Sequence, residues 1–270
     1  MERSKLFRLD GRTAVVTGAC GRLGPIWTRA LLEAGARVAC LDLDGIAPSP
    51  QLQELLAQHP EDASLHVGDV TRRESLDAAC QAVERDLGPV SILVNNAGID
   101  QPPGIARTFK IEEIPPELNR GILEVNVLGL FLATQAFLAS FRKAGGGSVV
   151  NIGSLYGLVS PDERFYAHIP VSPPFLKPPM YGAAKAAVCS LTRYLATHLA
   201  KDKIRVNTLH PGGVLGGQDA EFQRKFCDRV PLGRMAVAAD LMGPLVFLAS
   251  DASAYVTGQD LVVDGGFTAW

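Results

Sequence analysis

Short apolar runs alternate with longer stretches of helical periodicity along the whole chain. The runs are almost continuously apolar, which is typical of strands buried on both faces of a parallel sheet. Strands of this kind are predicted at residues 13–17, 37–41, 65–67, 92–95, 148–152, 205–209 and 260–263.

The stretches between these strands indicate helices. Pro115-Pro116 is typical of a helix start, whereas Gly35 and Gly88-Pro89 are stop signals. The predicted helices cover residues 23–34, 51–59, 74–87, 117–142, 181–200 and 239–249. Alternation of strands and helices requires right-handed crossovers. We therefore expect an α/β fold, a single Rossmann-type, doubly wound parallel sheet with helices on both faces, formed by residues 1–270 as one domain.

Composition and charge narrow the classes of partner and compartment. The 26 basic and 28 acidic side chains leave a formal charge of -2, which argues against a nucleic-acid partner. Five cysteines without a CxxC pair and five histidines without HxxxH spacing predict reduced thiols and no dedicated metal site. Residues 1–10 do not resemble a signal peptide, so a cytoplasmic protein is expected.

One stretch, residues 121–141, is apolar enough to raise the question of a membrane span. It contains Glu124, Asn126 and Gln135, each of which is costly in hydrocarbon. A helix buried in the domain or at a subunit interface is therefore expected, with no membrane partner.

The first predicted strand runs into the sequence TGACGRLG, residues 17–24, and then into a helix. Glycines in such a turn let the backbone approach a pyrophosphate, whose charge the helix N-terminus stabilises. Asp42 ends the second strand, where a carboxylate meets an adenosine ribose; its alternative role is a helix cap or a solvated turn. The predicted cofactor contacts in the turn are Gly18, Gly21, Arg22, Leu23 and Gly24.

Further segments, in the same order along the chain, resemble those of the short-chain dehydrogenase/reductase family. They are Gly68-Asp69-Val70, NNAG at residues 95–98, Asn126, Ser154, Tyr181-x-x-x-Lys185, Pro211-Gly212-Gly213-Val214 and VDGG at residues 263–266. The resemblance implies that Asp69 holds the adenine, that Asn95 lies beside the cofactor and steadies the sheet, and that Val214 meets the nicotinamide carboxamide. It adds Val70, Ala97, Gly98, Pro211 and Gly212 as cofactor contacts.

The glycine turn departs from the pattern TGxxxGxG of the family's compact members. Arg22 occupies the slot of the middle glycine, and the spacing is closer to that of extended relatives such as nucleotide-sugar epimerases. NAD is the expected cofactor, because Asp42 should repel a 2′-phosphate. NADP stays open because Arg22 offers a positive charge.

Tyr181 and Lys185 are four residues apart in a predicted helix, so both can point into one cleft. A free tyrosine has a pKa of about 10, and a neighbouring ammonium and a nicotinamide cation would favour the phenolate. The resemblance assigns Tyr181 as acid/base, Ser154 as the partner of the substrate oxygen, Lys185 as a ligand of the cofactor ribose and Asn126 as support for a water-linked proton relay. The implied reaction is hydride transfer between NAD(P) and a secondary alcohol or ketone on a small polyol, sugar-derived or cyclic substrate.

Two other functions remain open at this point. The glycine spacing is compatible with a sugar epimerase or dehydratase that retains NAD. A catalytically silent, cofactor-binding regulator is the third reading, in which Tyr181 is a core residue, Lys185 a solvated residue and Ser154 a turn hydroxyl.

The segment between Ser154 and Tyr181 is about twice as long as is usual in relatives and contains six prolines. We expect a Pro-rich insertion, residues 155–180, that covers the nicotinamide end and selects the substrate; the alternative is a surface excursion against a neighbouring subunit. Its candidate substrate contacts are Arg164, Tyr166, His168 and Lys177. Residues 160–166, 231–236 and the final Trp270 also resemble a branch associated with bacterial glycan modification, and relatives are commonly homodimers or homotetramers.

Overall fold

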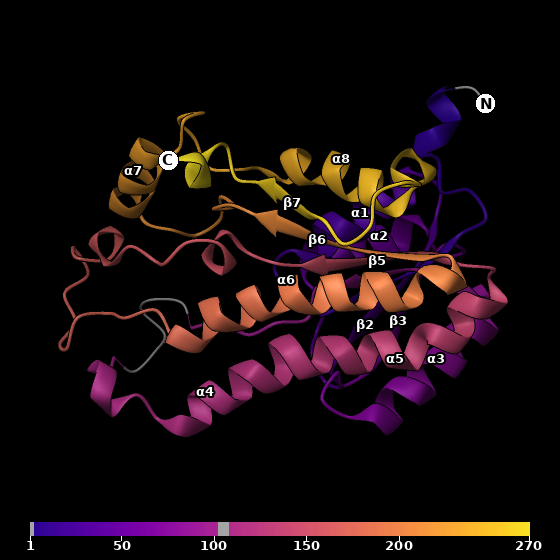
Figure 1. Cartoon of the computed structure of the whole chain (residues 1–270), viewed down its shortest axis with the longest axis horizontal. Coiled ribbons are helices and arrows are strands. Elements are labelled where there is room, and N and C mark those ends of the chain that lie inside the picture. Colours follow the sequence, from indigo (N-terminus) through magenta and orange to yellow (C-terminus); the bar gives the residue numbers. More distant parts are fainter. Residues whose placement is uncertain (1–2, 102–107) are drawn as a thin grey trace.

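The structure is a computed structural model that describes residues 3–101 and 108–270 (Figure 1). Seven parallel strands form one sheet in the order β3-β2-β1-β4-β5-β6-β7. The strands are β1 (Thr13–Thr17), β2 (Arg37–Asp42), β3 (Ala63–Val67), β4 (Val90–Asn95), β5 (Gly147–Ile152), β6 (Ile204–Pro211) and β7 (Asp260–Val263). The strand order reverses between β1 and β4, where doubly wound folds bind their ligands.

Helices cover both faces of this sheet (Figure 1). One face carries α1 (Gly24–Glu33), α2 (Pro50–Gln58) and α8 (Ala238–Ala249), whose apolar side chains share a core with β1, β2 and β4. The opposite face carries α3 (Arg73–Leu87), α5 (Leu130–Lys143) and α6 (Pro179–Leu199). The predicted fold class is confirmed: the near-continuous apolar strands are those of a sheet buried on both faces.

Every predicted strand and helix is present, and the structure differs in two places. The helix predicted at 117–142 is α4 (Pro116–Leu123), a π-helical turn (Glu124–Gly129) and α5 in succession. A helix that the sequence reading did not predict, α7 (Ala220–Arg229), begins where Asp219 accepts a hydrogen bond from the Phe222 N–H at 2.9 Å. This helix is rich in charge and short of apolar residues, so its sequence does not stand out as a core-packing helix.

The continuous helical stretch Pro116–Lys143 is long and apolar enough to cross a membrane by length and composition alone. Its apolar character has a local explanation, because Phe137 and Phe141 are fully buried in the core beneath the sheet. The helix α5 contacts α3 and β4. These contacts match those expected of a helix packed inside a domain.

The Pro-rich segment after β5 is ordered by a third hydrophobic cluster. Phe165, Tyr166 and Phe175 pack with Phe226 of α7 and with Phe267 near the C-terminus. The ring centroids of Tyr166 and Phe175 are 4.9 Å apart, and those of Phe165 and Phe226 are 5.6 Å apart. The segment therefore lies against α7 of the same chain and returns to the sheet at the start of α6.

Candidate active site

A cleft of about 540 Å³ opens at the carboxyl ends of β1, β2 and β4. Eleven of the predicted cofactor residues line it: Gly18, Gly21, Arg22, Leu23, Asp42, Asp69, Val70, Ala97, Gly98, Tyr181 and Lys185. The remaining predicted contacts lie outside its lining: Gly24, Asn95, Pro211, Gly212 and Val214. Eleven further residues line the cleft that were not predicted as cofactor contacts: Cys20, Leu43, Ile46, Gly68, Thr71, Asn96, Ile99, Asp100, Val125, Ile152 and Gly153.

The glycine turn between β1 and α1 leaves no room for side chains at two positions. Gly18 has φ +63°, and a Cβ there would lie 2.7 Å from Cα of Ala97. A Cβ on Gly24 would lie 2.0 Å from the Ala19 carbonyl oxygen. These two glycines let the turn pack directly against the backbones of Ala97 and Ala19. A compact glycine turn ahead of a helix N-terminus is the arrangement that binds a dinucleotide pyrophosphate.

Asn96 fastens this turn to the end of β4. Its Nδ2 donates to the carbonyl oxygens of Thr17 and Gly18, both at 2.9 Å, and its Oδ1 accepts from the Trp27 indole at 2.8 Å. Its neighbour Asn95 is buried, and its Nδ2 instead donates to Asn151 Oδ1 at 2.9 Å. Asn95 therefore joins β4 to β5, while Asn96 borders the cleft.

Asp42 and Arg22 lie on the same cleft but point to different places. The Asp42 carboxylate accepts hydrogen bonds from the backbone N–H groups of Cys20 and Leu43, each at 2.8 Å, so it holds the glycine turn against the end of β2. The Arg22 guanidinium donates to the Val214 carbonyl oxygen at 2.5 Å, across the cleft from the end of β2. The Arg22 guanidinium, which left NADP as an alternative cofactor, therefore binds the Val214 carbonyl in this structure and not the region of Asp42.

Asp69 lies in the loop that follows β3. Its Oδ1 accepts from the backbone N–H and the hydroxyl of Thr71, at 2.9 and 2.7 Å. These bonds fix a turn that brings Asp69 and Val70 to the cleft. Val70 also packs against Gly129 of the π-helical turn, where a Cβ would lie 2.8 Å from its methyl group.

Tyr181 and Lys185 occupy one face of the first turns of α6, as their spacing predicts. Lys185 is buried, its Nζ donates to the Ile152 carbonyl oxygen at 2.8 Å, and it lies 5.9 Å from the centroid of the Tyr181 ring. Ser154 follows Ile152 by two residues and is also buried. The structure thus brings the predicted triad together at the end of β5.

Burial dominates the proton affinities of this group. It raises the pKa of Tyr181, and the charge of Asp100 acts in the same direction, while a hydrogen bond with Ser154 lowers it. Burial lowers the pKa of Lys185 to about 8. The lowered tyrosine pKa expected from the sequence is therefore opposed by desolvation, and a further positive charge in the cleft is needed to favour the phenolate.

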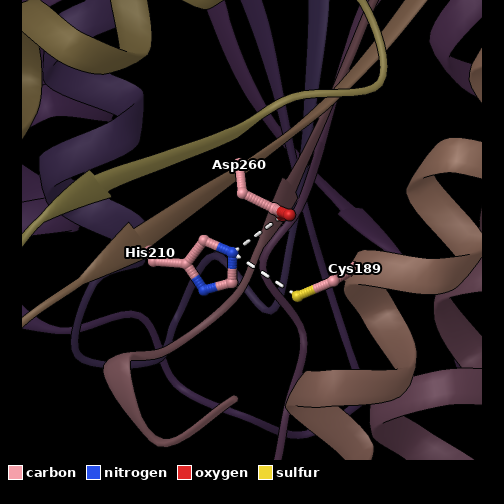
Figure 2. A group of neighbouring side chains, drawn as sticks. All are labelled: Cys189, His210 and Asp260. Atoms are coloured by element: carbon pink, nitrogen blue, oxygen red, sulfur yellow. Dashed lines mark hydrogen bonds and ion pairs between the residues drawn. The ribbon is translucent and has the colours of Figure 1, made fainter. Parts of the chain in front are cut away.

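His210 belongs to a cluster with Cys189 and Asp260, in which His210 and Cys189 are buried (Figure 2). Its Nδ1 is 3.1 Å from the Ser154 backbone N and 2.9 Å from the Ser154 carbonyl oxygen. Its Nε2 is 3.0 Å from Asp260 Oδ1 and 3.6 Å from Cys189 Sγ, and Arg193 pairs with Asp260 at 3.0 Å. Hydrogen bonds account for this cluster, which orients the backbone that carries Ser154.

Asn126 lies in the π-helical turn between α4 and α5, a distortion that is frequent at functional sites. Its Oδ1 accepts from the Ile99 N–H at 2.8 Å, and its Nδ2 donates to the Ile99 carbonyl oxygen at 3.0 Å. The amide thus holds the chain that follows Gly98. It shapes the cleft wall, while the relay assigned to it by resemblance remains a prediction.

None of the four candidates in the Pro-rich segment lines the cleft. Arg164 pairs with Asp162 and is largely exposed, and His168 pairs with Asp219 at 2.8 Å. Tyr166 is buried in the aromatic cluster. Of the four, Lys177 comes nearest to Tyr181, with its Nζ 5.0 Å from the ring centroid.

The comparison with known protein families agrees with this geometry. Residues 23–268 match the family model described as enoyl-(acyl carrier protein) reductase. The chain belongs to the short-chain dehydrogenase/reductase family. It is therefore an NAD(P)-dependent oxidoreductase.

Relatives within this family align along nearly their whole length. Galactitol 2-dehydrogenase (L-tagatose-forming) from Cereibacter sphaeroides is 36% identical over 276 residues, covering 100% of both chains. D-threitol dehydrogenase from Mycolicibacterium smegmatis is 34% identical, covering 97% of this chain and 95% of its own. A gluconate 5-dehydrogenase from Burkholderia cenocepacia, crystallised with NADP and tartrate, has a TM-score of 0.82 at 32% identity, with 99% of each chain covered.

Proposed function

We propose that this short-chain dehydrogenase/reductase oxidises a secondary alcohol of a small polyol to the ketone, with reversal under reducing conditions. The observation that carries the proposal is the meeting of Tyr181, Lys185 and Ser154 beside a cleft that the glycine turn also lines. The polyol names of two relatives support this substrate class. The resemblance to glycan-modifying enzymes gains no support from them.

In the proposed mechanism the chain binds and orients the alcohol and moves its proton. The Tyr181 hydroxyl oxygen takes the proton of the substrate hydroxyl, and Ser154 Oγ donates a hydrogen bond to the substrate oxygen. Lys185 contributes a buried positive charge that favours the tyrosinate and donates to the cofactor ribose. The bound nicotinamide supplies the hydride acceptor at C4. His210 acts indirectly, by fixing the Ser154 backbone. Asn126 fixes the Ile99 backbone and, in this proposal, also supports a water-linked proton relay.

The cofactor is bound, in this proposal, by the glycine turn, Asp42, Asp69 and the NNAG segment. These residues fit a dinucleotide, because Gly18 and Gly24 keep the turn compact at the start of a helix and the Asp42 carboxylate ends β2. Leu23 and Val70 would supply apolar contacts, and Pro211, Gly212 and Val214 would border the nicotinamide. We further propose that NAD is preferred, since the Arg22 guanidinium is bound to the Val214 carbonyl rather than to the region of Asp42.

Substitution of Asp42 tests this preference. In the wild type, kcat/KM with NAD should exceed that with NADP, because the carboxylate accepts ribose hydroxyls and repels a 2′-phosphate. Asp42→Ala should reduce the NAD/NADP ratio of kcat/KM by about tenfold or more, the effect of losing one charged hydrogen bond. The exposed Asp44→Ala is the control and should keep the wild-type ratio. A wild type that prefers NADP would contradict the proposal.

The substrate class is tested with purified protein, NAD⁺ and a panel of polyols, aldonates and monohydroxy secondary alcohols, followed by absorbance of the reduced cofactor. We expect the highest kcat/KM with a polyol. An epimerase or dehydratase would convert a sugar nucleotide without net cofactor reduction, and a silent regulator would bind the cofactor without turnover.

The remaining proposals concern the whole protein. Residues 1–270 act as one dinucleotide-binding and catalytic domain in the cytoplasm, without a nucleic-acid or membrane partner. We propose a homodimer or homotetramer, supported by the exposed apolar Leu123 and Leu128 on the outer side of the α4–α5 stretch. We also propose that the Pro-rich segment covers the nicotinamide end and selects the substrate, with Lys177, whose Nζ lies 5.0 Å from the centroid of the Tyr181 ring, as the residue through which it acts.

A further inference from the structure

An ion pair between Asp100 and Lys177 lies beside Tyr181. The Lys177 Nζ is 2.5 Å from Asp100 Oδ2 and 5.0 Å from the centroid of the Tyr181 ring. Asp100 comes from the loop after β4, and Lys177 comes from the Pro-rich segment. The pair thus joins two loops at the end of the cleft where Tyr181 lies.

The two charges are not equally accessible. The Lys177 side chain is 8% exposed, whereas that of Asp100 is 33% exposed. Asp100 lines the same cleft as Tyr181, while Lys177 lines a separate groove with Tyr156 and Pro178. A molecule that enters the cleft therefore meets the carboxylate first, with the ammonium behind it.

The carboxylate also retains capacity for a ligand. Asp100 Oδ1 accepts from the Gln101 N–H at 2.8 Å, and Oδ2 accepts from Lys177. Each carboxylate oxygen offers about two acceptor positions, and the described residues 3–101 and 108–270 fill one on each, so both oxygens can accept a further hydrogen bond. The partly buried ammonium orients the group, and a charge-assisted bond at such a site is stronger than a neutral one.

We propose that Asp100, oriented by Lys177, accepts a hydrogen bond from a substrate hydroxyl next to the reacting alcohol, and that the enzyme consequently selects neutral polyols with vicinal hydroxyls over sugar acids. This inference rests on the proposed function, because it places the reacting alcohol at Tyr181. A sugar acid would bring a second anion against a carboxylate that pairs with a single ammonium among the described residues. A polyol brings hydroxyl donors, which satisfy the carboxylate without added charge.

The electrostatics of the site are consistent with this position. The Asp100 charge raises the pKa of both Tyr181 and Lys185, so the carboxylate lies within interaction range of both groups. The geometry agrees, because the Lys177 Nζ contacts Asp100 Oδ2 and also lies 5.0 Å from the centroid of the Tyr181 ring. A hydroxyl bound to Asp100 would therefore lie within one substrate length of the proton acceptor. Arg164 and His168 have no such place, since they pair with Asp162 and Asp219 away from the cleft.

The test compares selectivity in wild type and Asp100→Asn, which keeps the shape and removes the charge. Measured values of kcat/KM for D-threitol, 2-butanol and gluconate give two ratios. In Asp100→Asn, the threitol/2-butanol ratio should fall about 10- to 100-fold, the range expected for losing a hydrogen bond to a charged group. The gluconate/threitol ratio should rise. Lys177→Met should lower the threitol/2-butanol ratio in the same direction, because the carboxylate loses its orienting partner.

Asp202→Asn is the matched control, since Asp202 is a part-buried carboxylate paired with Arg142 at 2.9 Å outside the cleft lining. It should keep both ratios, and thermal unfolding and NAD binding report whether each variant is folded. Equal losses for threitol and 2-butanol in Asp100→Asn, or a wild type that prefers gluconate, would overturn the diol site while leaving alcohol oxidation intact. Absence of turnover with every alcohol in the folded wild type would instead contradict the proposed function.

Discussion

Replacing Tyr181 by phenylalanine is expected to lower kcat/KM for alcohol oxidation by about 10²- to 10⁴-fold, the usual contribution of a general acid–base group. The ring stays in place between Lys177 and Lys185, so the Kd for NAD should remain close to that of the wild type. Single-turnover kinetics and cofactor titration measure the two quantities separately. Tyr194→Phe on the same helix is the control, because that ring is exposed and stacks on His198.

The pH dependence provides a second readout of the same group. Burial raises the pKa of Tyr181, so the phenolate that accepts the proton becomes more populated as the pH rises. Oxidation in the wild type should accelerate toward alkaline pH, and the slope should disappear in Tyr181→Phe. A variant with near-wild-type rates and an unchanged pH profile would remove Tyr181 from the mechanism.

Replacing Lys185 by methionine is expected to reduce kcat/KM by about 10²- to 10³-fold, comparable to the loss of one charged or polar stabilising group in an active site. The Kd for NAD should rise as well, since Lys185 is the proposed ribose donor. Methionine keeps the apolar stem in the buried site but has no ammonium. Lys201→Met, at an exposed position after α6, should leave both constants unchanged.

At pH 7 the free energy of unfolding of Lys185→Met should equal or exceed that of the wild type, although its activity falls. Burial lowers the pKa of Lys185 from its ordinary value of 10.5 to about 8. Between these values the unfolded chain binds more protons than the folded one, so the free energy of unfolding contributed by this group rises with pH. Below about pH 8 the buried ammonium is a cost, so Lys185→Met should unfold at an equal or higher denaturant concentration than the wild type at pH 7. Between pH 8 and 10 the wild type should gain stability relative to the variant.

The fold was predictable because most strands are short, largely apolar runs and because the helices between them, apart from α7, have a regular apolar period. The interruption of the predicted helix 117–142 was not, since the sequence around Asn126 retains helical propensity and the π-helical turn depends on tertiary contacts with Ile99. The helix α7 was not predicted because its apolar face consists mainly of Phe222 and Phe226. The residues that pack against them come from the Pro-rich segment, which is distant in sequence.

The site residues were predictable where the local backbone conformation or the spacing on one helix determines the residue type. Gly18 needs a positive φ, and Tyr181 with Lys185 needs one helix face. Asn96 belongs to the NNAG signature, but the cofactor contact was predicted for Asn95. Adjacent residues at a strand end face opposite sides, and the sequence does not say which of the two faces the cleft. Asp100 carried no signal of its own. Its significance appears when the fold brings Lys177 against it from 77 positions away.

Transfer of a deuterium label from substrate to cofactor tests the central claim most directly. A polyol deuterated at its secondary carbinol carbons is incubated with NAD⁺ and the wild-type protein, and both products are analysed by mass spectrometry. The account predicts one deuterium in each reduced cofactor and one ketone formed per label transferred, with the transfer lost in Tyr181→Phe. Retention of the label on the polyol with no reduced cofactor, in a folded protein that binds NAD, would contradict it.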